Sequence, residues 1–303
     1  MSVASSIGKG FSLARRSGPA VWILFLANLG LAALVGFPIY LNIQRFTGDS
    51  LMGREMARGF SADWLTDFAF SSQGSFDRYG KLIVVMGLVS LVLNSILAGG
   101  VLAHFRAPEQ KYSFGDFFRS AAHYGWRLVR LLIIGLICYW IVFKLVNEKL
   151  GMWVDQRTGN WASDRSVFYA HLAVTLLVLV GLGFFNLVMD YARVRVVLEE
   201  GTGAIQAFLA SLGFSLARFG KALGVYLVPS LCGLVLLAAY VLLFPWRVID
   251  AAIAGGSHFR EPLALAGLFF AQQLVMFWRF WFRVATWASE WSLYSGSRGG
   301  AQS

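Results

Sequence analysis

Long apolar stretches alternate along this chain with shorter segments that carry most of its charged residues. A helix needs about 20 mostly apolar residues to cross the hydrocarbon core of a bilayer. Six stretches have that length, at 20–41, 82–103, 128–147, 167–189, 223–244 and 263–287. The pattern therefore predicts an all-α fold, a polytopic membrane helix bundle with six transmembrane helices that form a single transmembrane domain over residues 1–303.

The connecting segments predict which helix ends face the cytoplasm. We place both termini and the connections 104–127 and 190–222 on one side. That side then holds more than half of the 26 Lys and Arg residues, but well under half of the 16 Asp and Glu residues. Basic residues are enriched on the cytoplasmic side of membrane proteins, so we expect both termini in the cytoplasm. On the opposite side, residues 42–81 predict an external amphipathic segment, with Ser61 as a candidate helix cap.

A short sequence recurs before alternate spans. GFSLAR occurs at 10–15 and at 213–218, and FRSAAH at 118–123 takes the corresponding place before the third span. The implied unit is a cytoplasmic interfacial amphipathic helix followed by two spans. This predicts three parallel two-helix repeats. Their approximate bounds are 1–105, 106–199 and 200–303. The alternative is that the amphipathic segments are only the first turns of longer spanning helices.

Charged side chains gather near the predicted cytoplasmic ends of the fourth and sixth spans. This candidate charge cluster consists of Asp190, Arg193, Arg279, Arg283 and Glu290. A charge at this depth either pairs with an opposite charge or extends to the headgroups. One hypothesis is therefore an ion pair of Asp190 with Arg279 or Arg283, and the other is that each side chain extends to the interface independently.

Neutral amides are the main polar groups within the spans. The candidate intramembrane polar contacts are Asn28, Asn94, Asn186, Gln272 and Gln273. Amides inside a membrane bundle commonly form hydrogen bonds between helices. We therefore expect contacts between helices at these positions, with substrate binding as the alternative.

The composition supports a membrane protein and excludes several other classes. Charged residues make up 14% of the chain, against about 25% in soluble domains. The net charge of +10 does not indicate nucleic-acid binding, because the cations are spread among loops beside apolar spans. The histidines are scattered singly, and Glu199-Glu200 lacks the Arg that follows the acidic pair of CAAX-type intramembrane proteases. The sequence thus predicts no enzyme, no cofactor and no metal site.

Several segments carry a resemblance to a known group of proteins. They are LAGGVLAHF at 97–105, FGDFFRSAAHYGWRLVRL at 114–131, MDYARVRVVLEEG at 189–201, FSLARFGKALGVYLV at 214–228 and RVATWASEWSLYSG at 283–296. Through them the chain resembles bacterial six-helix membrane proteins of undefined function, similar to the membrane domain found beside some glycerophosphodiester phosphodiesterases. The resemblance implies a fold and a bacterial inner-membrane location rather than an activity, because the sequence contains no phosphodiesterase domain.

The function that we expect is that of a non-enzymatic integral inner-membrane protein that contacts lipid or holds a partner. Its expected partners are membrane lipids and either another protein or a second copy of the chain, with no nucleic acid. The alternative is a transporter or channel-like protein for an apolar or amphipathic molecule. A hydrophilic cavity lined by Asn28, Asn94 and Gln272 would favour transport. A third reading, an enzyme that acts on lipid inside the membrane, would require a cleft with clustered acids or histidines.

Overall fold

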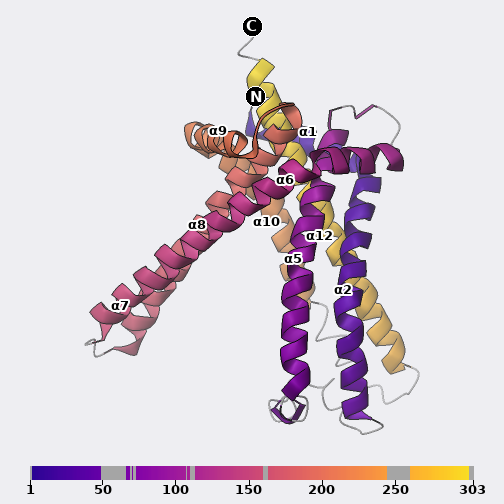
Figure 1. The fold of residues 1–303 in the computed structure, drawn as a ribbon, viewed down its shortest axis with the longest axis vertical. Helices are drawn as coiled ribbons and strands as arrows, with labels where there is room; N and C mark the ends of the chain where they lie inside the picture. The colour runs from indigo at the N-terminus through magenta and orange to yellow at the C-terminus, as the bar shows by residue number, and fades with distance from the viewer. Residues whose placement is uncertain are drawn as a thin grey trace. The chain divides into compact units, whose positions relative to one another are not determined.

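The computed structural model describes residues 2–48, 66–68, 70, 73–106, 108–109, 113–159, 163–243 and 260–299. Within these ranges every regular element is a helix (Figure 1). The helices are α1 (Val3–Arg16), α2 (Gly18–Thr47), α5 (Gln73–His104), α6 (Phe114–Val142), the π-helix η1 (Phe143–Leu150), α7 (Gly151–Thr158), α8 (Asp164–Leu198), α9 (Ala204–Ala217), α10 (Phe219–Leu243) and α12 (Arg260–Gly299). The prediction of an all-α fold is confirmed for this part of the chain.

Five of the described helical runs are long and apolar enough to cross a membrane. They are Gly18–Phe46, Asp77–His104, Phe114–Thr158, Arg165–Leu198 and Phe219–Leu242. The first four contain the first four predicted spans, and the fifth covers 223–242 of the predicted span 223–244, which is the pattern of a multi-pass membrane protein. The sixth predicted span, 263–287, lies within α12. This helix is not among the five, and the polar residues Gln272, Gln273, Arg279 and Arg283 interrupt its apolar sequence.

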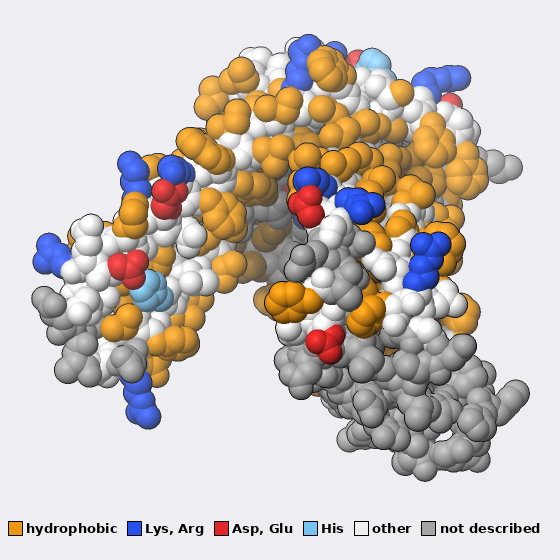
Figure 2. Space-filling view, turned by 60° about the horizontal axis from the view of Figure 1, so that its bottom comes forward, with side chains coloured by type: hydrophobic (Ala, Val, Ile, Leu, Met, Phe, Trp, Pro, Cys, Tyr) orange, Lys and Arg blue, Asp and Glu red, His pale blue; other side chains and the backbone are white. Residues whose placement is uncertain are grey.

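Large apolar side chains lie on the outside of these helices. On α8, Leu179 is 57% exposed and Val180 67% exposed, and on α10, Leu242 is 76% exposed. Figure 2 shows hydrophobic side chains over much of the face in view. Soluble monomers rarely expose continuous apolar surface on this scale. Helices that face lipid do so, because hydrocarbon then replaces water around them.

The chain divides into two compact units. Unit 1 contains Met1–Arg16, Ser95–Val228 and Ala285–Ser303, and unit 2 contains Ser17–Asn94 and Pro229–Val284. Three of the four boundaries fall inside continuous helices, so α5, α10 and α12 each contribute residues to both units, and the fourth lies between α1 and α2.

The longest element of unit 1 is a hairpin of helices. The helices α6, η1 and α7 follow one another without a break and lie antiparallel to α8 (Figure 1). Close packing along this hairpin depends on glycine. A Cβ on Gly135 would come within 2.8 Å of Met189 Cε, and one on Gly181 within 3.3 Å of a Val142 methyl group. The helical run from α6 to α7 ends only at Thr158, well beyond residue 147, where the hydropathy pattern predicts the end of the third span.

The helix α1 packs against both α12 and α10 within unit 1. Its buried residues, Ser6, Gly10 and Ala14, recur every four positions and so lie on one face. A Cβ on Gly10 would come within 2.6 Å of the Ser289 backbone, and Val3 contacts Gly224 on α10. The glycine therefore permits a close crossing of α1 and α12.

The three segments predicted to form amphipathic helices take two different forms in the structure. α1 and α9 are separate helices, and the backbone leaves helical geometry at Ser17 and at Arg218 before the next helix begins. Residues 114–119 are instead the first turns of α6, which continues without a break. In that segment Ser113 caps the helix by accepting a hydrogen bond from the Asp116 amide at 3.4 Å. The segment before the third span therefore follows the alternative, in which an amphipathic segment is only the first turns of a longer helix.

The repeat itself stays a prediction. The aligned serines do not share an environment, since Ser12 is exposed, Ser120 half-buried and Ser215 buried. The first residues of the predicted external segment 42–81 belong to α2, and residues 73–81 belong to α5. Ser61 and most of the residues between these helices lie outside the described part of the chain.

Candidate functional site

The C-terminal end of α8 is capped by an arginine from a distant part of unit 1. Arg106 follows α5, and its Nη2 donates hydrogen bonds to the carbonyl oxygens of Val197 and Leu198, at 2.5 and 3.1 Å. The last carbonyl groups of a helix have no partner within the helix. A guanidinium group is well suited to this position, because it satisfies these carbonyls and balances the negative end of the helix dipole.

The same arginine pairs with Glu200, directly beyond the helix end. Arg106 Nη1 lies 2.5 Å from Glu200 Oε1, which also accepts a hydrogen bond from the Tyr124 hydroxyl at 3.3 Å. The hydrogen bond from Arg106 lowers the pKa of Glu200 below its ordinary value, and the charge of Arg106 and the Tyr124 hydroxyl act in the same direction. Glu200 therefore stays ionised and held beside the end of α8.

Glu199 connects the end of α8 to α12. Its carboxylate accepts hydrogen bonds from Arg195 Nε at 2.9 Å and from the Tyr294 hydroxyl at 2.7 Å. Its side chain is only 12% exposed. A carboxylate removed from water needs such partners, because desolvation disfavours the charged form.

Asp190 is the most deeply buried member of this group. Its side chain is fully buried, accepting a hydrogen bond from Arg193 at 2.6 Å and one from the Trp287 indole at 3.2 Å. Glu290, one turn beyond Trp287 on α12, is also fully buried. We call this set the helix-end cluster. Its members are Arg106, Tyr124, Asp190, Arg193, Arg195, Glu199, Glu200, Trp287, Glu290 and Tyr294.

Three members of the predicted charge cluster belong to unit 1. Asp190 pairs with Arg193, one turn away on the same helix, and Glu290 lies in the same unit. Arg279 and Arg283 belong to unit 2. An ion pair of either with Asp190 therefore stays a prediction.

Several members of the helix-end cluster were not predicted from the sequence. In the sequence, Glu199 and Glu200 are recognisable only as an acidic pair without the Arg of the protease motif. Arg106 is one of the cations between the second and third predicted spans, and the sequence does not show which helix end it caps. No sequence signal marks Tyr294 or Trp287 as partners of α8, because each lies about a hundred residues from the carboxylate that it contacts.

Three of the five predicted amides, Asn28, Asn94 and Asn186, form hydrogen bonds between helices. In unit 2, Asn28 on α2 and Asn94 on α5 donate to each other through their side-chain amides, both at 2.9 Å. In unit 1, the Asn186 amide donates to the Tyr226 hydroxyl at 2.6 Å and connects α8 with α10. Gln272 is exposed and Gln273 half-buried on α12.

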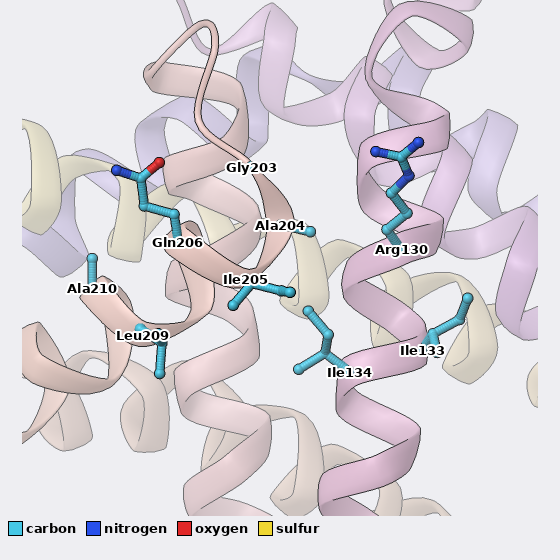
Figure 3. A pocket seen from close by; sticks show the side chains of 9 residues that line it. All are labelled: Arg130, Ile133, Ile134, Gly203, Ala204, Ile205, Gln206, Leu209 and Ala210. Atoms are coloured by element: carbon cyan, nitrogen blue, oxygen red, sulfur yellow. The ribbon is translucent and has the colours of Figure 1, made fainter.

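A cavity of about 810 Å³ lies between α6 and the beginning of α9, wholly within unit 1. Figure 3 shows Ile134 of α6 facing Ile205 of α9, with Arg130 one turn away on α6. The cavity is largely apolar and has one cation at its edge. Its residues are Arg130, Ile133, Ile134, Gly203, Ala204, Ile205, Gln206, Leu209 and Ala210.

Among the described residues no three His, Cys, Asp or Glu side chains lie together as the ligands of a metal ion would. No protein-family model, curated protein or solved structure matches this chain. The resemblance to the six-helix membrane proteins thus stays a prediction, and function has to be argued from the chain's own geometry.

Proposed function

We propose that this chain is a non-enzymatic inner-membrane protein of bacteria, with six spans and both termini in the cytoplasm, that contacts anionic lipid through a basic cytoplasmic face. In this proposal α12 supplies the sixth span. The helix-end cluster then lies at the cytoplasmic boundary, where it fixes the ends of α8 and α12 to each other. The short helices α1 and α9 lie at the same boundary.

The observation that carries this proposal is the exposure of cations on and beside the short helices of unit 1. Asp190 and Glu199 are buried or nearly so, and the exposed acids Glu109, Asp116 and Glu200 pair with Arg16, Arg119 and Arg106. The cations of the short helices and their neighbours that make up this face are exposed, namely Lys9, Arg15, Arg130, Arg218 and Lys221. Such a face attracts anionic headgroups, each nearby Lys or Arg contributing about 1 kcal/mol.

Transport is supported less well by the geometry. The amides of Asn28 and Asn94, which would line a hydrophilic path, form hydrogen bonds with each other. The Asn28 amide also donates to the Leu24 carbonyl at 2.8 Å. Their hydrogen-bonding groups thus hold α2 to α5 rather than being available to a passing molecule.

The test is the membrane topology. In a protein whose two cysteines are replaced, Gly159→Cys beyond α7 lies at an exposed position and Thr202→Cys beyond α8 at a half-buried one, so that both can be probed with a membrane-impermeant maleimide. We expect Gly159→Cys to react in intact spheroplasts and Thr202→Cys to react only in inverted vesicles. Reaction of Thr202→Cys from outside would contradict the proposed orientation, and with it the lipid-contacting role of the basic face.

A further inference from the structure

We infer that the cavity between α6 and α9 binds one anionic membrane lipid, with its phosphate at Arg130 and an acyl chain against the isoleucines of α6. This inference rests on the proposed function, because it requires that face of unit 1 to lie at the inner headgroup level. It goes further in assigning one site, one lipid class and one side chain that selects it.

The depth of Arg130 suits a phosphate group. Gly135 packs on Met189 of α8, and Arg130 lies five residues nearer the start of α6. At 1.5 Å per residue this is about 7 Å along the helix. Because α8 runs antiparallel to α6, the same distance from Met189 along α8 leads past Asp190 into the part of the helix that carries the helix-end cluster. Arg130 is therefore level with the helix-end cluster, which the proposed function places at the boundary between hydrocarbon and headgroups.

One face of α6 has the order of side chains that a bound lipid would meet. Trp126 is 63% exposed, and the Arg130 guanidinium lies over its ring at 5.1 Å. Ile133, Ile137 and Ile141 follow at three- and four-residue spacing, all exposed. An aromatic ring and a cation at headgroup level, followed by branched aliphatic side chains, match a lipid from its headgroup to its chain.

The cavity has the size and chemistry for the upper part of such a lipid. Its volume of about 810 Å³ lies within the ordinary range of ligand sites. Ile134, Ile205 and Leu209 supply apolar walls, and the cavity is lined by a cation but by no Asp or Glu. An anionic amphiphile is the ligand that complements both features.

The opposite wall adds weaker positive character. Gly203 begins α9 with no side chain to cap its first amides, and these first residues line the cavity. The first N–H groups of a helix have no acceptor within the helix, and they favour anions. They would share the phosphate with Arg130, which supplies the full charge.

The test measures binding of dioctanoyl phosphatidylglycerol to the purified full chain by native mass spectrometry. We expect Arg130→Gln to weaken binding about tenfold, since it removes one charge-assisted contact. Ile205→Asp, at a 68% exposed position, should abolish binding by placing a negative charge in the cavity. Arg119→Gln is the matched control, because Arg119 is an exposed arginine of the same helix outside the cavity, and it should change binding less than twofold.

Further arms identify the source of the phosphate. Dioctanoyl phosphatidylcholine should bind at least tenfold more weakly, and inorganic phosphate at equal concentration should not displace the anionic lipid. Equal losses in Arg130→Gln and Arg119→Gln would show diffuse attraction and overturn the site. Displacement by inorganic phosphate would overturn the lipid assignment. Either result leaves the topology test untouched, so failure of this inference is distinguishable from failure of the proposed function.

Discussion

Replacing Asp190 should test whether the helix-end cluster stabilises unit 1. In Asp190→Ala the bond from Arg193 to a buried carboxylate is lost, which costs about 1.5–3 kcal/mol, and the Trp287 indole loses an acceptor worth about 1 kcal/mol. Because both partners are largely buried, solvent screening reduces these values little. The expected loss of unfolding free energy is therefore about 2.5–4 kcal/mol. Asp190→Asn keeps an acceptor for the indole and should lose about half as much.

The structure supplies both an assay and a control for this prediction. Cys138 is buried on α6, whereas Cys232 is exposed. In a Cys232→Ser background, the reactivity of Cys138 with a fluorogenic maleimide across a denaturant series therefore reports unfolding of unit 1. The control is Arg119→Ala, whose partner Asp116 is 72% exposed and 3.8 Å away, so it should change stability by at most about 1 kcal/mol. If Asp190→Ala cost no more than this control, the buried pair would not stabilise the unit.

Three further predictions concern the contacts around this cluster and between other helices. Arg106 lowers the pKa of Glu200, so the ionised carboxylate stabilises the fold above the ordinary pKa of a glutamate. This stabilisation disappears as the pH falls through the lower pKa of the folded state. The wild-type protein should therefore have a higher thermal stability than Glu200→Gln at pH 7, and the two stabilities should converge below pH of about 4. Asn94→Ala removes both bonds to the amide on α2 and should cost about 1 kcal/mol in a detergent unfolding titration, whereas no change would mean that these bonds contribute nothing. Gly10→Ala should release α1 to limited proteolysis, because its Cβ would overlap α12, whereas Gly8→Ala, with nothing within 4 Å, should leave the digestion unchanged.

The spanning helices could be predicted from sequence because their formation is dictated locally. In lipid a helix satisfies its own backbone groups, so an apolar run of sufficient length determines the element. The run 167–189 thus lies inside α8. The end of the third span was not predictable in this way. Lys144 and Glu148 resemble a loop boundary in the sequence, but they form an ion pair at 2.7 Å along the π-helix, and the helix continues.

The site was predictable only where its contacts are local or chemically obligatory. Asp190 was recognised because a carboxylate near a membrane needs a partner. The structure pairs it with Arg193 on its own helix, a contact that equal depth did not single out. The capping of α8 by Arg106 depends on how α5 and α8 are packed, and no periodicity in the sequence encodes this packing.

The unbroken run from Phe114 to Thr158 constrains how much of the protein the bilayer can contain. Its 45 residues correspond to about 68 Å of α-helix, more than twice the roughly 30 Å thickness of the hydrocarbon. Even a strongly tilted helix would leave a third or more of this length in water or among headgroups. The tip near Asp155 and His171, whose side chains approach to 3.0 Å, would then stand clear of the lipid. Molecules in the aqueous compartment could reach it there without entering the membrane.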